Sequence, residues 1–163
     1  MVEESLRSSQ LDWTILRPAT YMQTPIAFLN ASRTTMALGL SPRRLFTPVD
    51  VEDVAQAAAE VLLATGHTGR AYELAGTEVL SMRDMAERMA QAWGHPVVIR
   101  RLPSALVALV ASRRYGRGSY RPIKAMFDHY NTDGFVGSSD DLRALLDRPP
   151  ASFDVAMRRL AAN

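Results

Sequence analysis

Cysteine is absent from this sequence of 163 residues. Its absence excludes disulfide bonds, iron–sulfur clusters, zinc sites built from cysteine and a thiol nucleophile. The three histidines, His67, His95 and His129, lie far apart in the sequence and form no H-E-x-x-H pattern. We therefore expect no metal site in this chain.

Long hydrophobic runs are absent as well. The longest unbroken apolar run, residues 105–111, is far too short to cross a bilayer, because a membrane-spanning helix needs about 20 residues. Residues 1–7 have no apolar core of the kind found in signal peptides. Since 47% of the residues are apolar and the length suits one domain, we expect a folded, soluble, cytoplasmic protein with no membrane partner.

Lysine is rare and acidic residues are missing from one long stretch. The basic residues are 18 arginines and a single lysine, Lys124, and no acidic residue lies between Glu87 and Asp128. A basic block can attract phosphates or nucleic acid. No helix-turn-helix and no stacking framework accompanies it, so nucleic-acid binding is the weaker interpretation. We expect a solvated surface whose arginines pair with acids elsewhere.

The common phosphate-binding and nucleophile motifs are missing. The nine glycines form no G-x-G-x-x-G, because Arg121 stands where a third glycine should follow Gly116 and Gly118, and no strand precedes them. The sequence contains no G-K-[ST] loop and no G-x-S-x-G elbow. This chain therefore carries neither a dinucleotide fingerprint nor a phosphate loop of its own.

What is present indicates an α/β chain. Strands alternating with helices imply βα units and a parallel sheet. Only the runs 13–17 and 71–75 look able to sit inside a sheet, and two strands do not make a stable doubly wound domain. Further strands are predicted at residues 45–49 and 97–100, helices at 3–9, 50–64, 81–93, 104–112, 122–130, 138–146 and 152–160, and a flexible basic loop at 113–120.

Caps and apolar stripes define two of these helices. Asp50 and Ser81 are expected N-caps, with Asp53 and Asp84 at the spacing of a capping box. A methionine stripe at helical spacing indicates core packing rather than a ligand site. The positions expected to be buried are Val51, Val54, Ala55, Ala58, Val61 and Leu62 on the first helix, and Met82, Met85, Met89 and Trp93 on the second.

Tyr120 and Lys124 have the Y-x-x-x-K spacing of short-chain dehydrogenases. On a helix this spacing puts the lysine one turn from the phenol, where its charge lowers the phenol pKa. Pro122 lies between the two residues, and a glycine-rich loop precedes them. We therefore expect this pair not to be catalytic, and no other catalytic residue is assigned.

Four segments resemble the NmrA-like family, whose members are atypical or extended short-chain dehydrogenases. Residues 3–18 resemble its E-x-x-L-x-x-S-x-L-x-W-T-I-L-R-P passage, and residues 46–55 are similar to its V-x-V-x-D-V-A helix start. Residues 69–81 resemble its G-x-x-Y-x-L-T-G strand and turn, and residues 148–153 its R-P-P-x-S-F segment. The four pieces occur in the family order and span nearly the whole chain.

The resemblance implies the C-terminal part of a Rossmann-like doubly wound α/β fold plus a mostly helical substrate lobe. In this family the glycine fingerprint and the ribose-binding acid precede the strand at 13–17, so the N-terminal nucleotide-binding strands are expected to be missing. Residues 1–163 are then a single truncated unit, with residual Rossmann strands near 13–17 and 71–75. The small C-terminal lobe is expected from about 20–50 and 95–163.

The resemblance also implies a ligand site at the carboxyl end of the strand 13–17, where open α/β folds bind ligands. For Tyr21 and Met22 the alternative is simple burial under the C-terminal lobe. The expected site residues are Pro18, Ala19 and Thr20 for cofactor binding, and Tyr21, Met22, Met126 and Tyr130 for the substrate side.

The function implied is that of the C-terminal portion of an NAD(P)-binding oxidoreductase-type protein, whose intact family transfers hydride from NAD(P)H. The alternative is a non-enzymatic redox sensor that binds a regulatory protein, because no catalytic pair is evident. The chain alone is expected to bind NAD(P) weakly or not at all, since a fingerprint helix is the main pyrophosphate anchor. A separate N-terminal Rossmann half is a candidate partner, beside a small-molecule substrate.

Overall fold

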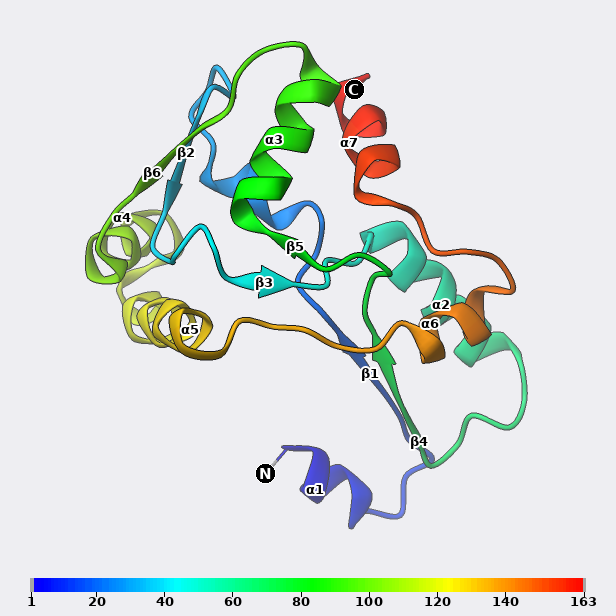
Figure 1. Cartoon of the computed structure of the whole chain (residues 1–163). Coiled ribbons are helices and arrows are strands. Elements are labelled where there is room, and N and C mark those ends of the chain that lie inside the picture. The colour runs from blue at the N-terminus through cyan, green and yellow to red at the C-terminus, as the bar shows by residue number, and fades with distance from the viewer. Residues whose placement is uncertain (1, 163) are drawn as a thin grey trace.

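Two parallel strand pairs form the framework of the structure, a computed structural model that describes residues 2–162. β1 runs beside β4, with Thr14 opposite Arg70 and Pro18 opposite Leu74, and β2 runs beside β6. The short antiparallel pair of β3 and β5 lies between them (Figure 1). The strands are β1 (Thr14–Pro18), β2 (Thr35–Leu38), β3 (Leu45–Phe46), β4 (Arg70–Leu74), β5 (Leu80–Ser81) and β6 (Val98–Arg101).

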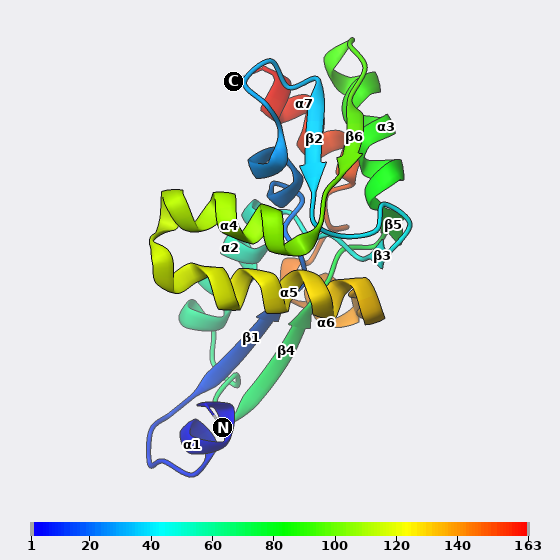
Figure 2. The ribbon, with the colours of Figure 1, turned by 90° about the vertical axis from the view of Figure 1, so that its left-hand side faces the viewer.

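Helices surround the two strand pairs in separate groups. α2 and α6 pack together beside β1 and β4, whereas α3 packs on α7. α4 and α5 lie side by side as a helical pair next to β2 (Figures 1 and 2). The helices are α1 (Val2–Arg7), η1 (Thr24–Phe28), α2 (Val51–Leu63), α3 (Met82–Trp93), α4 (Ser104–Tyr115), η2 (Arg117–Ser119), α5 (Tyr120–Asp133), α6 (Asp140–Leu146) and α7 (Phe153–Ala161).

Most predicted elements are present, whereas the short elements β5 and η1 were not predicted, and three further differences are informative. The basic segment 113–120, predicted as a loop, is largely helical, because α4 continues to Tyr115 and α5 begins at Tyr120. Arginine is a good helix former, and only Gly116, at φ 93°, requires a turn. The strand predicted at 45–49 is reduced to β3, and β2 was not predicted.

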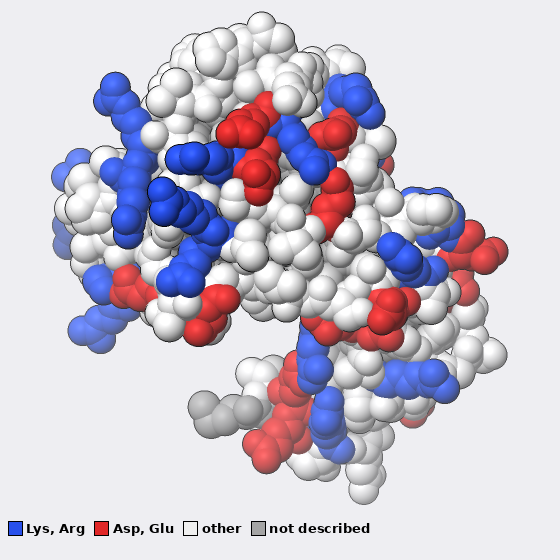
Figure 3. Space-filling model, viewed as in Figure 1, with Lys and Arg blue, Asp and Glu red and all other residues white. Residues whose placement is uncertain are grey.

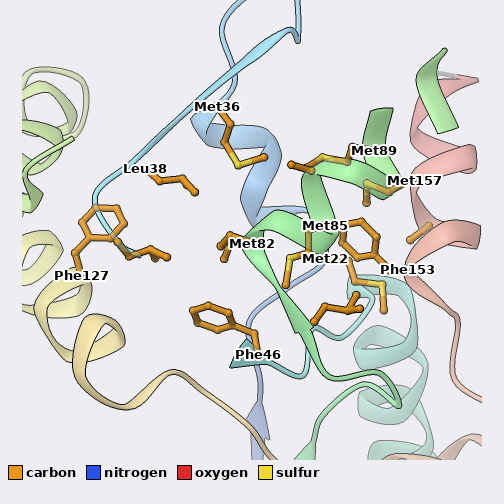
Figure 4. Close-up of a cluster of buried hydrophobic side chains, with 14 residues drawn as sticks. Met22, Met36, Leu38, Phe46, Met82, Met85, Met89, Phe127, Phe153 and Met157 are labelled. Atoms are coloured by element: carbon orange, nitrogen blue, oxygen red, sulfur yellow. The ribbon is translucent and has the colours of Figure 1, made fainter. Parts of the chain in front are cut away.

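A methionine-rich core fills the space between α3, α7, β2 and α5 (Figure 4). Met82, Met85 and Met89 are 2%, 0% and 0% exposed, so the expected packing role of the α3 stripe is confirmed. Trp93 is only partly buried and donates its indole N–H to the Met157 carbonyl at 3.3 Å. This core holds α3 in place, and α3 in turn positions Met82.

Asp50 caps α2 as predicted, accepting a hydrogen bond from the Glu52 amide at 3.2 Å. Asp53 does not complete a capping box: its carboxylate accepts from Arg148 and from the Ala151 amide instead. The inward face of α2 also differs from the expectation, since Leu62 is 83% exposed and Ala57 is buried. The buried face of α2 is rotated relative to the predicted one, because the Asp53 carboxylate is directed toward the segment between α6 and α7.

The capping box of α3 makes folding stability depend on pH. The Ser81 amide and hydroxyl both donate to the Asp84 carboxylate, at 2.8 and 2.7 Å. These bonds lower the pKa of Asp84 below its usual 3.8, the amide contributing most. Because the folded-state pKa lies below the unfolded-state value, the carboxylate stabilises the fold above the unfolded-state pKa. This stabilisation is lost as pH falls through the folded-state pKa.

We expect Asp84→Asn to lower the urea midpoint at neutral pH, and the difference from wild type to shrink below about pH 4. Glu87→Gln is the matched control, since Glu87 lies on the same helix, is exposed, and makes no hydrogen bond or ion pair among residues 2–162. Urea unfolding across this pH range provides the measurement. A constant difference between Asp84→Asn and wild type at all pH values would contradict the capping argument.

Candidate functional site

The segment that leaves the carboxyl end of β1 is fixed by backbone hydrogen bonds on both sides. The Ala19 amide donates to the Leu74 carbonyl at 2.9 Å, and the Val49 amide donates to the Thr20 carbonyl at 3.0 Å. Gly76 permits this arrangement, because a Cβ there would lie 1.8 Å from the Pro48 carbonyl oxygen. The end of β1 therefore meets the segments after β3 and β4 at a single edge.

A cavity of about 320 Å³ opens at this edge. Six of the seven predicted site residues line it, whereas Met22 does not: it is 1% exposed and lies in the methionine-rich core (Figure 4). Tyr21 is partly buried against the core around Val49 and Leu74 and also lines the cavity. The cavity, here named the aromatic pocket, is lined by Pro18, Ala19, Thr20, Tyr21, Thr24, Phe28, Leu40, Phe46, Met82, Met126, Phe127, Tyr130 and Phe135.

Aromatic rings from separate segments form the walls of the aromatic pocket. Tyr130 meets Phe46 edge-on, with ring centroids 5.6 Å apart and planes at 89°. Phe28 packs against Phe127 with centroids 5.7 Å apart, and Phe135 lies 6.4 Å from Tyr130. The sequence analysis did not identify Phe28, Phe46 or Phe135, because only the tertiary fold brings them beside the β1 segment.

Phe135 reaches the pocket because α5 ends sharply. Gly134 adopts φ 68°, and a Cβ there would lie 2.6 Å from the Leu45 carbonyl oxygen. The Phe135 amide then donates to that carbonyl at 2.9 Å, and the Thr47 amide donates to the Phe135 carbonyl at 3.0 Å. Glycine at this position thus lets the chain turn from α5 onto β3.

The pocket contains few polar groups. The Thr20 hydroxyl is the one buried side-chain polar atom without a hydrogen-bond partner in the described part of the chain. No carboxylate, lysine, arginine or histidine lines the pocket. A buried, unpartnered hydroxyl is costly, so its place in a ligand-sized pocket indicates a group that a ligand can satisfy.

Tyr120 and Lys124 lie outside the aromatic pocket. The Lys124 ammonium pairs with Asp128 one turn further along α5, and this hydrogen bond raises the pKa of Lys124. Asp128 also accepts from the Ser104 hydroxyl at 2.7 Å. Lys124 is therefore part of a surface network between α4 and α5.

Two further classes of site are absent from residues 2–162. No group of three or more histidine, aspartate or glutamate side chains in this range could hold a metal ion. None of the helices there is long and apolar enough to cross a membrane.

The chain is similar in sequence to two reductases. No protein-family model matches it. The chain is 31% identical over 112 residues to a (4-alkanoyl-5-oxo-2,5-dihydrofuran-3-yl)methyl phosphate reductase of Streptomyces griseus, a match that covers 67% of this chain and 40% of that protein. It is 28% identical over 99 residues to an NAD(P)H azoreductase of Xenophilus azovorans, covering 58% of this chain and 34% of that protein.

Solved structures share the fold. An NADPH-dependent quinone oxidoreductase from Escherichia coli superimposes with a TM-score of 0.79 at 23% identity, over 97% of this chain and 58% of the other. NmrA, a negative transcriptional regulator solved in complex with NAD, gives 0.69 at 18% identity, over 99% and 56%. The chain therefore spans little more than half the length of these proteins.

The fold defines an α/β chain of the Rossmann-like class, corresponding to its C-terminal part with a helical lobe. Within that class, the chain has the NmrA-like fold of the extended short-chain dehydrogenases. The resemblance inferred from the four sequence segments is thereby confirmed.

Proposed function

We propose that this chain provides the acceptor-binding wall of an NAD(P)H-dependent reductase for planar conjugated molecules such as quinones. One observation carries the proposal: an aromatic-walled pocket lies at the carboxyl end of β1 and contains one buried hydroxyl without a partner. Aromatic side chains pack favourably against flat π-systems. The likeness to a quinone oxidoreductase and an azoreductase supports this class of acceptor.

Pro18, Ala19 and Thr20 are proposed to face the nicotinamide, which when bound supplies a hydride to the acceptor. The Thr20 hydroxyl suits a polar group such as a carboxamide, because it is buried and unpartnered. The sequence contains no G-x-G-x-x-G, so we propose that residues outside this chain hold the pyrophosphate. The chain alone then binds NAD(P) weakly or not at all.

Tyr21, Met126 and Tyr130 are proposed to hold the acceptor. Reduction of a quinone adds one hydride and one proton, so two electrons enter and a hydroquinone leaves. No carboxylate, lysine or histidine lines the aromatic pocket, so the proton for the hydroquinone anion comes from water or from the Tyr21 or Tyr130 hydroxyl. A chain with this pocket therefore suits acceptors that need no strong acid from the protein.

A redox-sensing regulator is the second candidate function, and the lack of a carboxylate, lysine or histidine in the pocket lining favours it. NmrA, which shares the fold, is a transcriptional regulator. A regulator would retain ligand binding at the aromatic pocket and recognise a protein partner without turnover. Reduction of a quinone in a steady-state assay distinguishes the two functions.

We expect Thr20→Val to stabilise the chain by about 1 kcal/mol, because it removes an unsatisfied buried hydroxyl. The same change should lower kcat/KM for NADPH by about tenfold, since a hydrogen bond to the cofactor is lost. Thermal unfolding measures the first effect. NADPH oxidation with menadione, by the chain and a dinucleotide-binding half supplied in trans, measures the second.

Tyr120→Phe and Lys124→Ala serve as controls in this assay. Both remove a polar group outside the aromatic pocket, so turnover should change less than about twofold, whereas a true acid–base pair would contribute about a hundredfold. A hundredfold loss in either control would show that the Tyr120–Lys124 pair takes part in catalysis. A Thr20→Val chain that is destabilised and kinetically unchanged would show that the hydroxyl is structural.

A further inference from the structure

A second cavity, of about 430 Å³, lies between α4 and α5 and is here named the α4–α5 pocket. Its walls are almost wholly apolar and include Leu106 and Val110 of α4, Ile123 of α5, and Ala37 of β2. Leu106 and Val110 remain 45% and 58% exposed. Exposed aliphatic side chains around a cavity of this size are typical of a site that an apolar ligand covers.

The α4–α5 pocket adjoins the aromatic pocket, because Phe28, Met126 and Phe127 line both cavities. Along α5, Ile123 lies in the α4–α5 pocket and Tyr130 in the aromatic pocket, a separation of roughly 10 Å on an α-helix. A hydrocarbon chain that lies along α5 in the first cavity therefore points toward the second.

The outer end of the α4–α5 pocket is cationic. Arg114 lines it, with its guanidinium carbon 5.8 Å from the centre of the Tyr115 ring. Arg114 makes no ion pair in the described part of the chain, and no acidic residue lies between Glu87 and Asp128. Lys and Arg side chains gather over this side of the molecule (Figure 3). An unpaired guanidinium beside apolar walls suits an anionic group attached to a hydrocarbon chain.

We propose that the α4–α5 pocket binds an amphiphilic anion, whose aliphatic chain lies along α5 and whose carboxylate or phosphate contacts Arg114. The far end of the ligand points toward Tyr130 in the aromatic pocket. If the proposed function holds, this ligand is also the acceptor. The acceptor is then a conjugated molecule with an apolar tail that ends in an anionic group. The binding itself does not depend on cofactor or turnover.

Dodecanoate titrated into the full chain by calorimetry tests the binding, because one chain supplies all the walls of the pocket. Saturable binding is expected, and Arg114→Ala should weaken it by about five- to tenfold. Arg113→Ala is the matched control: Arg113 occupies the same last turn of α4, is exposed, and does not line the pocket. The Arg114→Ala chain should bind dodecanol and dodecanoate with the same affinity.

A second pair of variants tests the apolar part of the site. Ala111→Leu fills the α4–α5 pocket and should weaken dodecanoate binding by at least about tenfold. Ala125→Leu adds the same atoms to the exposed face of α5, outside both pockets, and should leave binding unchanged. Circular dichroism melts of both variants show whether the fold is retained.

The proposal is overturned if dodecanoate does not saturate, or if Ala111→Leu and Ala125→Leu bind it equally. Equal binding of dodecanol and dodecanoate to the wild-type chain overturns the role of Arg114. Retention on anionic phospholipid vesicles without binding of free dodecanoate would identify a membrane-facing surface instead and also overturns it. Failure of menadione reduction bears only on the proposed function, since these titrations contain neither NADPH nor a quinone.

Discussion

Replacing Asp53 by alanine is expected to lower the free energy of unfolding by about 3 kcal/mol. The Asp53 side chain is 1% exposed and accepts hydrogen bonds from the Arg148 guanidinium and the Ala151 amide, each at 2.7 Å. Its removal leaves the Ala151 amide without this partner and releases the segment before α7 from α2. Because Phe153 of α7 is fully buried in the methionine-rich core, the loss of these hydrogen bonds also destabilises the packing of that core.

Glu52→Ala is the matched control for Asp53→Ala. Glu52 lies on the same turn of α2 and pairs with Arg159 at 2.6 Å, yet its side chain is 62% exposed. An exposed ion pair contributes less than about 1 kcal/mol, and salt screens it. Urea unfolding at low and high salt should show a small, salt-sensitive loss for Glu52→Ala and a large, salt-resistant loss for Asp53→Ala. Equal losses would contradict the importance of burial.

The elements that sequence reasoning identified are those specified by nearby residues. The Ser81–Asp84 capping box and the methionine stripe define α3 within its own length, and both are present. β2 was missed because the short run Thr35–Leu38 is stabilised by pairing with β6, more than sixty residues later. Long-range pairing of this kind leaves no periodic signal in a four-residue strand.

The candidate site also has a part that could be predicted from the sequence and a part that could not. The β1 segment with Thr20 and Tyr21 could be placed at a sheet edge from the strand and the family resemblance. The aromatic walls could not, because Phe46 and Phe135 meet through the turn at Gly134 and the pairing of the following segment with β3. A lone phenylalanine gives no sequence signal of whether it will face a core or a ligand.

The lining of the aromatic pocket has two phenols, Tyr21 and Tyr130, but no carboxylate, lysine or histidine, and under the proposed function this lining limits the chemistry that it can support. Acceptors that need a protonated carbonyl would require a stronger acid nearby, and Lys124 is paired with Asp128 outside the pocket. Quinones and related conjugated acceptors place the added charge on oxygens that water can protonate. The pocket is therefore better suited to such acceptors than to simple ketones.

The chain on its own is expected to self-associate through the end of the molecule that contains β1 and β4. These strands pair with each other, and no other strand within residues 2–162 extends their sheet. α1 has no buried residue and contacts β1 chiefly through the Arg17–Glu3 ion pair. An open strand edge beside partly buried Trp13 and Leu16 is a template for pairing with another chain.

The end of α2 adds apolar surface to this region. Leu62 and Leu63 are 83% and 86% exposed, and the loop that follows them leads directly into β4. Exposed leucines at the end of α2 and an open strand edge both favour association, so light scattering after gel filtration should report a mass above that of the monomer. A dinucleotide-binding half supplied by co-expression should cover this end and give a defined complex.

Charged variants test which surface causes the association. Leu62→Lys combined with Leu63→Lys should shift the chain toward monomer, because these side chains make few contacts to lose and the charges repel. Leu109→Lys combined with Val155→Lys changes the net charge equally at exposed apolar sites on α4 and α7, and should leave the association unchanged. A wild-type chain that is a monodisperse monomer with one cooperative unfolding transition would refute the prediction. The open edge of β1 would then be stable in water, and the chain would be a self-sufficient domain.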